Sequence, residues 1–351
     1  MSGGRFGRMG DGCAASRLGP YAEPMTERLR WGILGTGGIA RLFTSDLNLT
    51  GFTVSAVGSR TQETADAFAA AHGIPRAHGS YEALVSDPEV DAIYVSTPHP
   101  YHAEGALLAL EHGKHVLVEK PFTINAPEAR RVVDLAGEKG LVVLEAMWTR
   151  WLPHMVRVRE LIASGALGEV RAVIADHDQR LPTDPTHRLQ DPVLGGGALL
   201  DLGIYPVSFA WDVLGAPSSV HAISTPTATG VDRQTAIVLG YPGGEQALIH
   251  TLLDARGPST AVVIGTEARI EIDPVWYTPT SFSLLDPADA VLERFEAEVP
   301  GRGMQFQAAE LERLVADGVT AGEILPPEES VAIMGTLDEV RRQIGLRYPG
   351  E

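Results

Sequence analysis

The chain has 351 residues, of which 44% are hydrophobic and 21% are charged, and its formal net charge is −17. These values are ordinary for a globular protein of two domains. The negative charge, with no lysine- or arginine-dense block after residue 30, argues against nucleic acid and anionic membrane as partners, and no apolar run approaches the roughly 20 residues of a membrane span.

Residues 1–28 are expected to form a disordered extension. They are rich in Gly, Arg and Ser and lack the apolar stretch of a secretory signal, so Met25 is a candidate native start. The single cysteine, Cys13, excludes an intrachain disulfide and a cysteine-based metal site. A reducing, cytoplasmic setting fits these features.

The glycine-rich segment after residue 34 is the first functional signal. The apolar run Trp31–Leu34 is followed directly by Gly35-Thr36-Gly37-Gly38-Ile39-Ala40 and then by a helical pattern. In a G-x-G-x-x-A turn of this kind, Gly35 permits the turn, Gly37 lets the backbone approach a pyrophosphate, and Ala40 lets the helix lie close to its strand. The glycines alone also suit an ordinary strand–helix turn, so the elements that follow matter.

Strands and helices alternate up to residue 147. Further strands are expected at Phe52–Gly58, Asp91–Ser96, His115–Glu119 and Leu141–Glu145, and helices at Thr61–Ala71, Tyr81–Val85, Tyr101–Glu111 and from Pro127 to Gly140. Strands rich in Val, Ile and Leu and bounded by helices predict a parallel sheet covered on both faces. Residues 29–147 are therefore expected to form a doubly wound dinucleotide-binding domain.

Residues 148–351 have a different pattern. Helices are expected at Pro153–Ala163, at Ala198–Val213 after the run Gly195-Gly196-Gly197, near Met304–Ala316 and near Glu328–Ile344. Strands are expected at Glu169–Asp176, Val220–Ser224, Thr235–Tyr241, Gln246–Leu253, Ala261–Gly265 and Ala268–Ile272. Successive strands without helices between them predict a substrate-binding α/β domain with a large, mostly antiparallel sheet, whose open face would be covered in an oligomer.

The end of the second strand bears on the choice of cofactor. Dinucleotide sites usually place an acidic residue about 20 residues beyond the glycines to bind the ribose 2′-hydroxyl. Here Gly58 is followed by Ser59-Arg60. Because an arginine suits a 2′-phosphate, we expect NADP, with NAD as the second choice. A solvated surface arginine is the alternative interpretation.

Three residues are candidates for the chemistry. Lys120 follows the apolar strand ending at Glu119, at the edge of the sheet where α/β folds bind ligands. An ammonium there can bind a substrate hydroxyl and stabilise the alkoxide that develops from it. Asp201 and Tyr205 stand four residues apart on one helical face, and a tyrosine near a cation can act as acid or base. Spacing alone does not exclude purely structural roles.

The remaining candidates surround the same edge. Thr97, Pro98, His99 and His102 follow the strand ending at Ser96 and are expected near the cofactor, with His99 also near the substrate. Trp148, Arg150 and His177 are candidates for the substrate site, with packing at the domain junction as the alternative for the first two. A metal site is not expected, because no third ligand accompanies the two histidines, and no hydrolase elbow or P-loop motif occurs.

Together these motifs resemble the Gfo/Idh/MocA family of oxidoreductases. The segments on which this resemblance rests are Gly35-Thr36-Gly37-Gly38-Ile39-Ala40, Ser96-Thr97-Pro98-His99-Pro100-Tyr101-His102, Glu119-Lys120-Pro121-Phe122 and Asp201-Leu202-Gly203-Ile204-Tyr205-Pro206. Glu145-Ala146-Met147-Trp148-Thr149-Arg150-Trp151 and Gly195-Gly196-Gly197-Ala198-Leu199-Leu200-Asp201 resemble the branch that holds dimeric trans-dihydrodiol dehydrogenases and NADP-dependent aldose 1-dehydrogenases. The likeness extends from about residue 29 to residue 348.

The resemblance implies a Rossmann domain, a C-terminal domain with an open antiparallel sheet that serves as the oligomer surface, and hydride transfer between NADP and a sugar or cyclic diol. It assigns catalysis to Lys120, Asp201 and Tyr205 and places His99 at the edge. The expected cofactor contacts are Gly35, Thr36, Gly37, Gly38, Ile39, Ser59, Arg60, Thr97, Pro98, His99, His102, Glu119 and Lys120.

The leading hypothesis is oxidation of an aldose at C1 to a lactone, in a cytoplasmic homodimer or dimer of dimers. A trans-dihydrodiol, an inositol or a keto-sugar is the alternative substrate. A regulatory protein that binds NADP without turnover is the alternative of another class.

Overall fold

The computed structural model describes residues 28–351, so Cys13, Met25 and nearly all of the expected N-terminal extension lie outside the described residues. Arg28 belongs to the folded part. Its guanidinium pairs with Glu312 at 3.0 Å and lies 4.0 Å from the ring centroid of Phe52. Arg28, which the sequence analysis placed in the extension, is therefore part of the fold.

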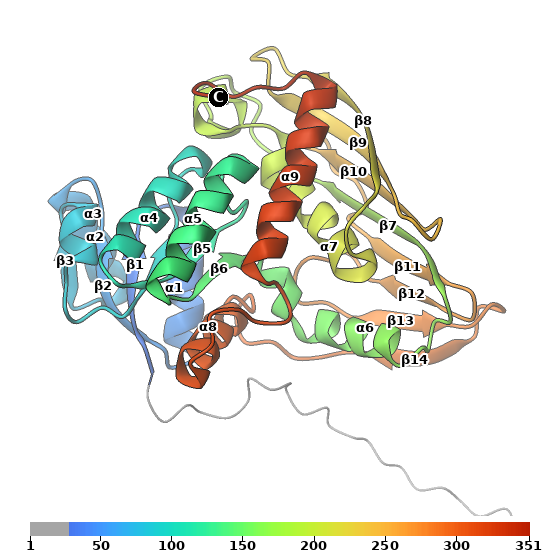
Figure 1. The fold of residues 1–351 in the computed structure, drawn as a ribbon, viewed down its shortest axis with the longest axis horizontal. Helices are drawn as coiled ribbons and strands as arrows, with labels where there is room; N and C mark the ends of the chain where they lie inside the picture. Colours follow the sequence, from blue (N-terminus) through green and yellow to red (C-terminus); the bar gives the residue numbers. More distant parts are fainter. Residues whose placement is uncertain (1–27) are drawn as a thin grey trace, which may run out of the picture.

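The first domain is built on a six-stranded parallel sheet (Figure 1). Its strands are β1 (Arg30–Leu34), β2 (Thr53–Gly58), β3 (Arg76–His78), β4 (Ala92–Val95), β5 (His115–Glu119) and β6 (Val143–Ala146). They lie in the order β3-β2-β1-β4-β5-β6, as in a Rossmann fold, which confirms the expected fold class. The strand order reverses between β1 and β4, so the carboxyl ends of these strands mark the position where such folds bind ligands.

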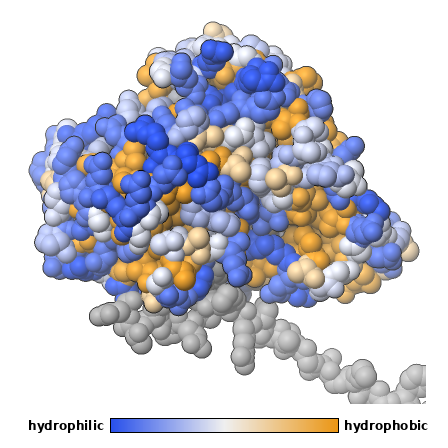
Figure 2. Space-filling model, in the orientation of Figure 1, coloured by the Kyte–Doolittle hydropathy of each residue, from blue (hydrophilic) through white to orange (hydrophobic). Residues whose placement is uncertain are grey.

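Helices cover both faces of this sheet. They are α1 (Gly38–Leu49), α2 (Gln62–His72), α3 (Tyr81–Val85), α4 (His102–Glu111) and α5 (Ala126–Lys139). α1 packs beside α2, whereas α4 contacts both α3 and α5. The sequence sets their ends: Thr61 Oγ1 accepts the N–H of Thr64 at 3.3 Å to begin α2, and Gly73 ends it with φ 70°. The surface over α4 and α5 is mainly hydrophilic, as expected for amphipathic helices (Figure 2).

The second domain contains an eight-stranded sheet. Its strands are β7 (Val170–Asp178), β8 (Ser219–Pro226), β9 (Asp232–Gly240), β10 (Gln246–Leu252), β11 (Ala261–Gly265), β12 (Arg269–Ile272), β13 (Phe282–Leu285) and β14 (Val291–Phe295). The order is β14-β13-β12-β11-β7-β10-β9-β8, and only the β7–β10 pair is parallel. The mostly antiparallel sheet is confirmed. The sequence analysis did not anticipate β13 and β14. In the chain they come after a segment rich in proline and aspartate that follows β12.

Helices join the two domains through the C-terminal part of the chain. The second domain contributes α6 (Pro153–Ala163), α7 (Ile204–Leu214), α8 (Gln305–Asp317) and α9 (Pro327–Ile344). α7 packs on β7 and β10, and α9 packs on β8 but also on α5 and β6 of the first domain (Figure 1). α8 contacts α1 and β6. A boundary at residue 147 therefore separates the two sheets but not the helices that cover them.

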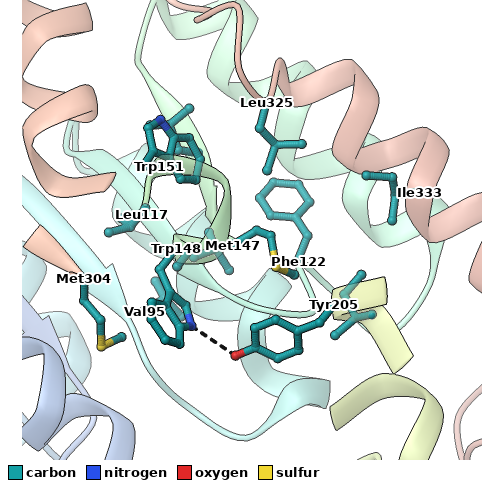
Figure 3. Packing of buried hydrophobic residues seen from close by; sticks show 14 of the residues in the cluster. Val95, Leu117, Phe122, Met147, Trp148, Trp151, Tyr205, Met304, Leu325 and Ile333 are labelled. Atoms are coloured by element: carbon teal, nitrogen blue, oxygen red, sulfur yellow. Dashed lines mark hydrogen bonds between the residues drawn. The ribbon is translucent and has the colours of Figure 1, made fainter. Parts of the chain in front are cut away.

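The domain junction is apolar. Phe122 and Met147 of the first domain pack in one cluster with Trp151, Leu325 and Ile333 of the second (Figure 3). Trp151 and Ile333 are 1% and 0% exposed. Such burial makes the junction part of the core rather than a wet domain interface.

One face of the second sheet carries exposed apolar side chains. Ile174 on β7, Leu248 on β10, Val238 on β9 and Ile223 on β8 are 44%, 42%, 41% and 76% exposed. These strands are neighbours in the sheet. We call these four side chains the open apolar face.

Among the described residues, the segment Pro192–Leu214 has the length and apolar composition of a membrane span, which the sequence analysis did not anticipate. However, 89% of its most apolar 18 residues are buried inside the protein, as in the core helix of a globular protein. The expected helix over Ala198–Val213 is also not uniform, because a π-helical turn, Leu199–Gly203, precedes α7.

Candidate active site

The glycine turn forms an open helix N-terminus at the end of β1. Gly35 has φ 109°, and a Cβ atom there would lie 3.1 Å from the carbonyl oxygen of Ser96, so only glycine suits the position. A Cβ on Gly37 or Gly38 would meet nothing within 4 Å. α1 has neither a side-chain cap nor an acidic residue in its first turn. Its free N–H groups and helix dipole are suited to a diphosphate.

Residues next to the glycine turn also leave groups available to a ligand. Thr97 Oγ1 is buried and makes no hydrogen bond with the described residues. Pro98 is exposed, and Thr36 and Ile39 are half-buried beside the glycines. An unpaired hydroxyl next to an open backbone turn fits a bound dinucleotide.

Ser59 and Arg60 follow β2, the strand next to β1. Ser59 is 7% exposed, and its N–H donates to the carbonyl of His78 at 3.0 Å. Arg60 is exposed and forms no hydrogen bond or ion pair within residues 28–351. Its charge remains available for a phosphate.

Lys120 lies where the two domains meet. It follows β5, and its Nζ donates to the backbone carbonyl of Asp201 at 2.8 Å. Nζ also lies 3.6 Å from Asp201 Oδ1 and 5.0 Å from the ring centroid of Tyr205. The structure therefore brings together the lysine of one domain and the aspartate and tyrosine of the other.

Asp201 lies among three basic side chains. Besides Lys120, its Oδ1 lies 3.2 Å from Arg188 and 3.7 Å from His99 Nε2. Burial raises the pKa of Asp201, but Lys120, Arg188 and His99 outweigh it and hold the pKa well below its ordinary value. Burial lowers the pKa of Lys120, but Asp201, Tyr205 and Glu119 raise it above its ordinary value. The pair is thus charged at neutral pH.

Tyr205 has a defined partner. The indole Nε1 of Trp148 donates to the Tyr205 hydroxyl oxygen at 3.0 Å (Figure 3). Burial raises the pKa of Tyr205, whereas the Lys120 charge and the Trp148 hydrogen bond lower it, and the net direction is upward. The phenol is therefore protonated at neutral pH, and the two donors stabilise the phenolate that forms when it loses its proton.

His177 lies against Tyr205. The two rings meet edge to face at 5.0 Å, and His177 stacks on Tyr277 at 3.8 Å. Its Nδ1 faces the carbonyl of Leu202 at 3.2 Å, and its Nε2 is 2.7 Å from Gln179 Nε2. Burial lowers the pKa of His177 to about 3, so the ring is neutral and carries its proton on Nδ1.

His99 is also neutral. Its Nδ1 lies 3.0 Å from the carbonyl oxygen of Gly195 and donates to it, which leaves Nε2 unprotonated beside Asp201. Burial lowers the pKa of His99 to about 3, although Asp201 raises it. This ring can accept, but not donate, a hydrogen bond at Nε2.

Three of the expected site residues, Arg150, His102 and Glu119, are buried, and their polar groups have partners within the protein. Arg150 is 3% exposed, and its guanidinium is used by Asp212, Glu329 and Ser208, so it holds helices together instead of binding substrate. His102 is 1% exposed, with a carbonyl oxygen 2.8 Å from each ring nitrogen, so it links the loop at Thr97 to that at Pro121.

Glu119 is the third of these buried residues. It is 3% exposed, accepts from the hydroxyl of Tyr94, and accepts from the N–H of Lys120 at 3.1 Å. Burial raises the pKa of Glu119 to about 7. The carboxyl therefore lies behind Lys120 and supports it rather than facing a cofactor.

The sequence analysis missed Arg188, Gln179, Tyr277 and Tyr94. Arg188 lies in the loop 181–194, whose path the sequence pattern does not define, and Tyr277 lies in the irregular segment between β12 and β13. No local motif marks these residues. Within residues 28–351, no group of three or more His, Cys, Asp or Glu side chains is arranged to hold a metal ion.

Family models match both domains. Residues 29–147 match the oxidoreductase family model with an NAD-binding Rossmann fold, and residues 155–271 match the GFO/IDH/MocA C-terminal domain. Among solved structures, a 3-ketoreductase from Actinomadura kijaniata in complex with NADP and TDP-benzene is 28% identical, with a TM-score of 0.79 over 91% of this chain and 98% of that chain. A known protein thus has the same two domains in the same order along its chain.

Curated relatives match this chain over 92% of its length. A trans-1,2-dihydrobenzene-1,2-diol dehydrogenase from Bos taurus is 36% identical over 92% of this chain and 98% of its own. An NADP-dependent D-xylose 1-dehydrogenase from Hypocrea jecorina is 34% identical over 92% of this chain and 93% of its own. The chain therefore belongs to the Gfo/Idh/MocA family of oxidoreductases, and it carries the family's Rossmann and C-terminal domains.

Proposed function

We propose that this protein is an NADP-dependent dehydrogenase that oxidises an aldose at C1 to a lactone. The observation that carries the proposal is the meeting of Lys120, Asp201 and Tyr205 from two domains, with Nζ of Lys120 within 3.6 Å of Asp201 Oδ1 and 5.0 Å of the Tyr205 ring centroid. A cation, a carboxylate and a phenol in one buried place suit proton transfer coupled to hydride transfer. A dehydrogenase of D-xylose among the relatives supports this substrate class.

The preference for NADP rests on Arg60. NADP, when bound, supplies the nicotinamide C4 that exchanges hydride with substrate. The turn at Gly35–Gly38 would hold its diphosphate, and Thr97 Oγ1 and the unpaired guanidinium of Arg60 are the polar groups left to contact it. An arginine can grip a 2′-phosphate with a forked, charge-assisted contact.

Tyr205 takes the proton of the substrate hydroxyl in this scheme. Its neutral phenol must first lose its own proton, which Lys120 and the N–H of Trp148 favour by stabilising the phenolate. In the direction of reduction the neutral phenol is already the required acid. Lys120 holds the reacting oxygen and stabilises its negative charge, and Asp201 keeps the ammonium charged and in place.

A trans-dihydrodiol is the second candidate substrate, because the relatives at 36% identity carry that activity in their name. An inositol or a keto-sugar reduced in the opposite direction would use the same residues. A cytoplasmic location is also part of the proposal, since the chain has one cysteine.

We also propose that the protein forms a homodimer, or a dimer of dimers, through the open apolar face. Four apolar side chains, each at least 41% exposed, lie on adjacent strands there. Water contact with such a patch costs free energy that a second copy of the sheet would remove.

A spectrophotometric screen tests the activity. We expect NADPH to form with one of a panel of pentoses, hexoses and cyclic diols. Lys120→Ala and Tyr205→Phe should each lower kcat by about 100-fold or more, because each removes a group that acts on the proton, while Kd for NADP stays near that of the wild type.

Matched controls are Lys139→Ala at the exposed end of α5 and Tyr241→Phe, whose buried hydroxyl has no hydrogen-bond partner among the described residues. Both should keep full turnover. Full activity in both Lys120→Ala and Tyr205→Phe would refute the scheme. Binding of NADP without turnover of any compound in the panel would favour the regulatory alternative.

A further inference from the structure

The helix that carries Asp201 and Tyr205 contains a proline in its interior. Pro206 is the third residue of α7 (Ile204–Leu214) and is buried. The preceding turn, Leu199–Gly203, is π-helical, and the N–H of Ile204 contacts the carbonyls of Leu199 and Leu202. The region thus changes from the five-residue to the four-residue hydrogen-bond register just before Pro206.

Proline removes one donor from either register. In an α-helix the N–H of residue 206 would bond to the carbonyl of Leu202, and in a π-helix it would bond to the carbonyl of Asp201. Pro206 has no N–H, so neither bond can form. Both Asp201 and Leu202 are buried, at 7% and 3% exposure, so whichever carbonyl the absent N–H would have reached needs another donor.

Side chains of the active site take these two carbonyls. Lys120 Nζ donates to the Asp201 carbonyl at 2.8 Å, and His177 Nδ1 donates to the Leu202 carbonyl at 3.2 Å. The first donor comes from the Rossmann domain and the second from β7. The N–H that Pro206 lacks would fall on one of these two carbonyls, and both of them instead hold side chains next to Tyr205.

We infer that Pro206 is a positioning residue for Lys120 and His177. This inference rests on the proposed function. The carbonyl of Asp201 fixes the ammonium at 2.8 Å, closer than the carboxylate at 3.6 Å, and uses only one of its three N–H groups. The other two remain for the substrate oxygen, whereas Oδ1 of the carboxylate is already in contact with Arg188.

The same device fixes the tautomer of His177. With Nδ1–H committed to the Leu202 carbonyl, Nε2 must be an acceptor, and the amide of Gln179 donates to it at 2.7 Å. The ring is thereby held against Tyr205, with centroids 5.0 Å apart. An N–H at position 206 would compete for the carbonyls on which both arrangements depend.

Pro206→Ala supplies the missing N–H. We expect kcat to fall at least 10-fold and its pH profile to shift, with Kd for NADP within twofold of wild type and a Tm equal to or above it, since the change removes a helix breaker. Pro153→Ala is the matched control, because Pro153 begins α6, where an N–H would have no helical partner. It should leave kcat unchanged. Pro206→Ser adds the same N–H and should reproduce the Pro206→Ala result, which guards against failure of one variant to fold.

A second readout does not need activity. The chain has three lysines, Lys114, Lys120 and Lys139, so lysine-labelled protein gives few side-chain NMR signals. Loss of the carbonyl contact in Pro206→Ala should lower the titration midpoint of Lys120 and leave those of Lys114 and Lys139 in place.

The outcomes separate the two proposals. An unchanged Lys120 signal, wild-type kcat, or a kcat loss accompanied by equal losses of Tm and NADP binding would overturn the inference about Pro206. If the wild type turns over no substrate while the Lys120 signal still shifts, the proposed activity fails and the positioning role of Pro206 stands.

Discussion

At the scale of single residues, the site depends on charges that the fold removes from water and pairs. Lys120 and Asp201 would each be costly to bury alone, and together they keep each other ionised. Arg188 adds a second cation beside Asp201 at 3.2 Å. The result is a buried Lys120–Asp201 pair with a half-exposed arginine beside it, and the net positive charge of the three suits an alkoxide that forms next to them.

Arg60 determines the cofactor preference in our proposal. Arg60→Asp should weaken NADP binding by more than 10-fold, since the guanidinium–phosphate contact is lost and a repulsion replaces it. NAD binding should change little. Isothermal titration with both dinucleotides measures this, with Arg131→Asp as control, because Arg131 is also exposed and unpaired among the described residues. Equal losses of NADP and NAD would argue against a 2′-phosphate contact.

Glu145 predicts a pH dependence of stability. Burial raises the pKa of Glu145 to about 7, so the folded protein keeps this proton up to about pH 7, whereas the unfolded chain loses it near the ordinary value of 4.5. The free energy of unfolding must therefore fall as pH rises from 4.5 to 7. Glu145→Gln has no carboxyl to titrate and so does not lose this stability. The free energy of unfolding of the variant minus that of the wild type should therefore rise by about 3 kcal/mol between pH 4.5 and pH 7.

Urea unfolding of both proteins at pH 5 and pH 8 measures the difference. Gln retains an oxygen for the N–H of Phe122, which Glu145 accepts at 3.1 Å. The exposed Glu138→Gln on α5 is the control and should show no pH-dependent difference. A Glu145→Gln curve parallel to that of the wild type would place the carboxyl's pKa near its ordinary value.

At the scale of elements, two glycines in the turn between β1 and α1 meet different needs, one for the backbone conformation and one for access of a ligand. Gly35 is needed because its backbone has φ 109° and lies against Ser96, whereas Gly37 has φ −72° and open space around it. Stability depends on the first glycine, and access of a ligand to the backbone depends on the second. The sequence analysis assigned the turn to Gly35 and the approach of a pyrophosphate to Gly37, and the backbone geometry fits this division.

Gly35→Ala should lower the free energy of unfolding by about 1–3 kcal/mol, because it forces an L-residue into a left-handed conformation and onto the Ser96 carbonyl. Gly37→Ala should leave stability near wild type but weaken NADP binding. Thermal unfolding and cofactor titration of the two variants distinguish the effects. Equal loss of stability in both would contradict the assignment.

Element boundaries were predictable where local chemistry sets them. The helices Tyr81–Val85 and Pro153–Ala163 match the expected residues, and Gly73 and Gly140 end their helices in the left-handed conformation. The π-helical turn at Leu199–Gly203 was not predictable, because its register depends on partners from distant strands. Hydrophobic periodicity does not distinguish four-residue from five-residue hydrogen bonding over one turn.

At the scale of the whole molecule, α9 returns from the second sheet to pack on α5 and β6 of the Rossmann domain. The shared apolar core fixes the two domains relative to each other (Figure 3). That geometry holds Lys120 against Asp201 and so assembles the site.

The open apolar face predicts association. Leu248→Lys on the interior strand β10 should convert the proposed dimer to monomers, because it places a charge in the middle of the interface. Sedimentation velocity measures the change. Val319→Lys is the control, since Val319 is 43% exposed but lies outside the sheet. A monomeric wild type, or a dimer that Leu248→Lys leaves intact, would contradict the sheet interface.

The sequence by itself determined the fold class, and it singled out the side chains that we propose as the reactive groups. Strand and helix periods, the glycine turn and the residues after each strand are local properties, and they correctly predicted the Rossmann sheet and the mostly antiparallel sheet. The order of strands in the parallel sheet was not predicted and comes from the structure.

Only the tertiary structure decided which of these groups meet. Arg150 and His102 had suitable chemistry, but their polar atoms are used by nearby helices and loops. Arg188 and Tyr277, which carry no motif, lie beside Asp201 and His177. Side-chain partners depend on the packing of segments far apart in the chain, and no local pattern encodes those distances.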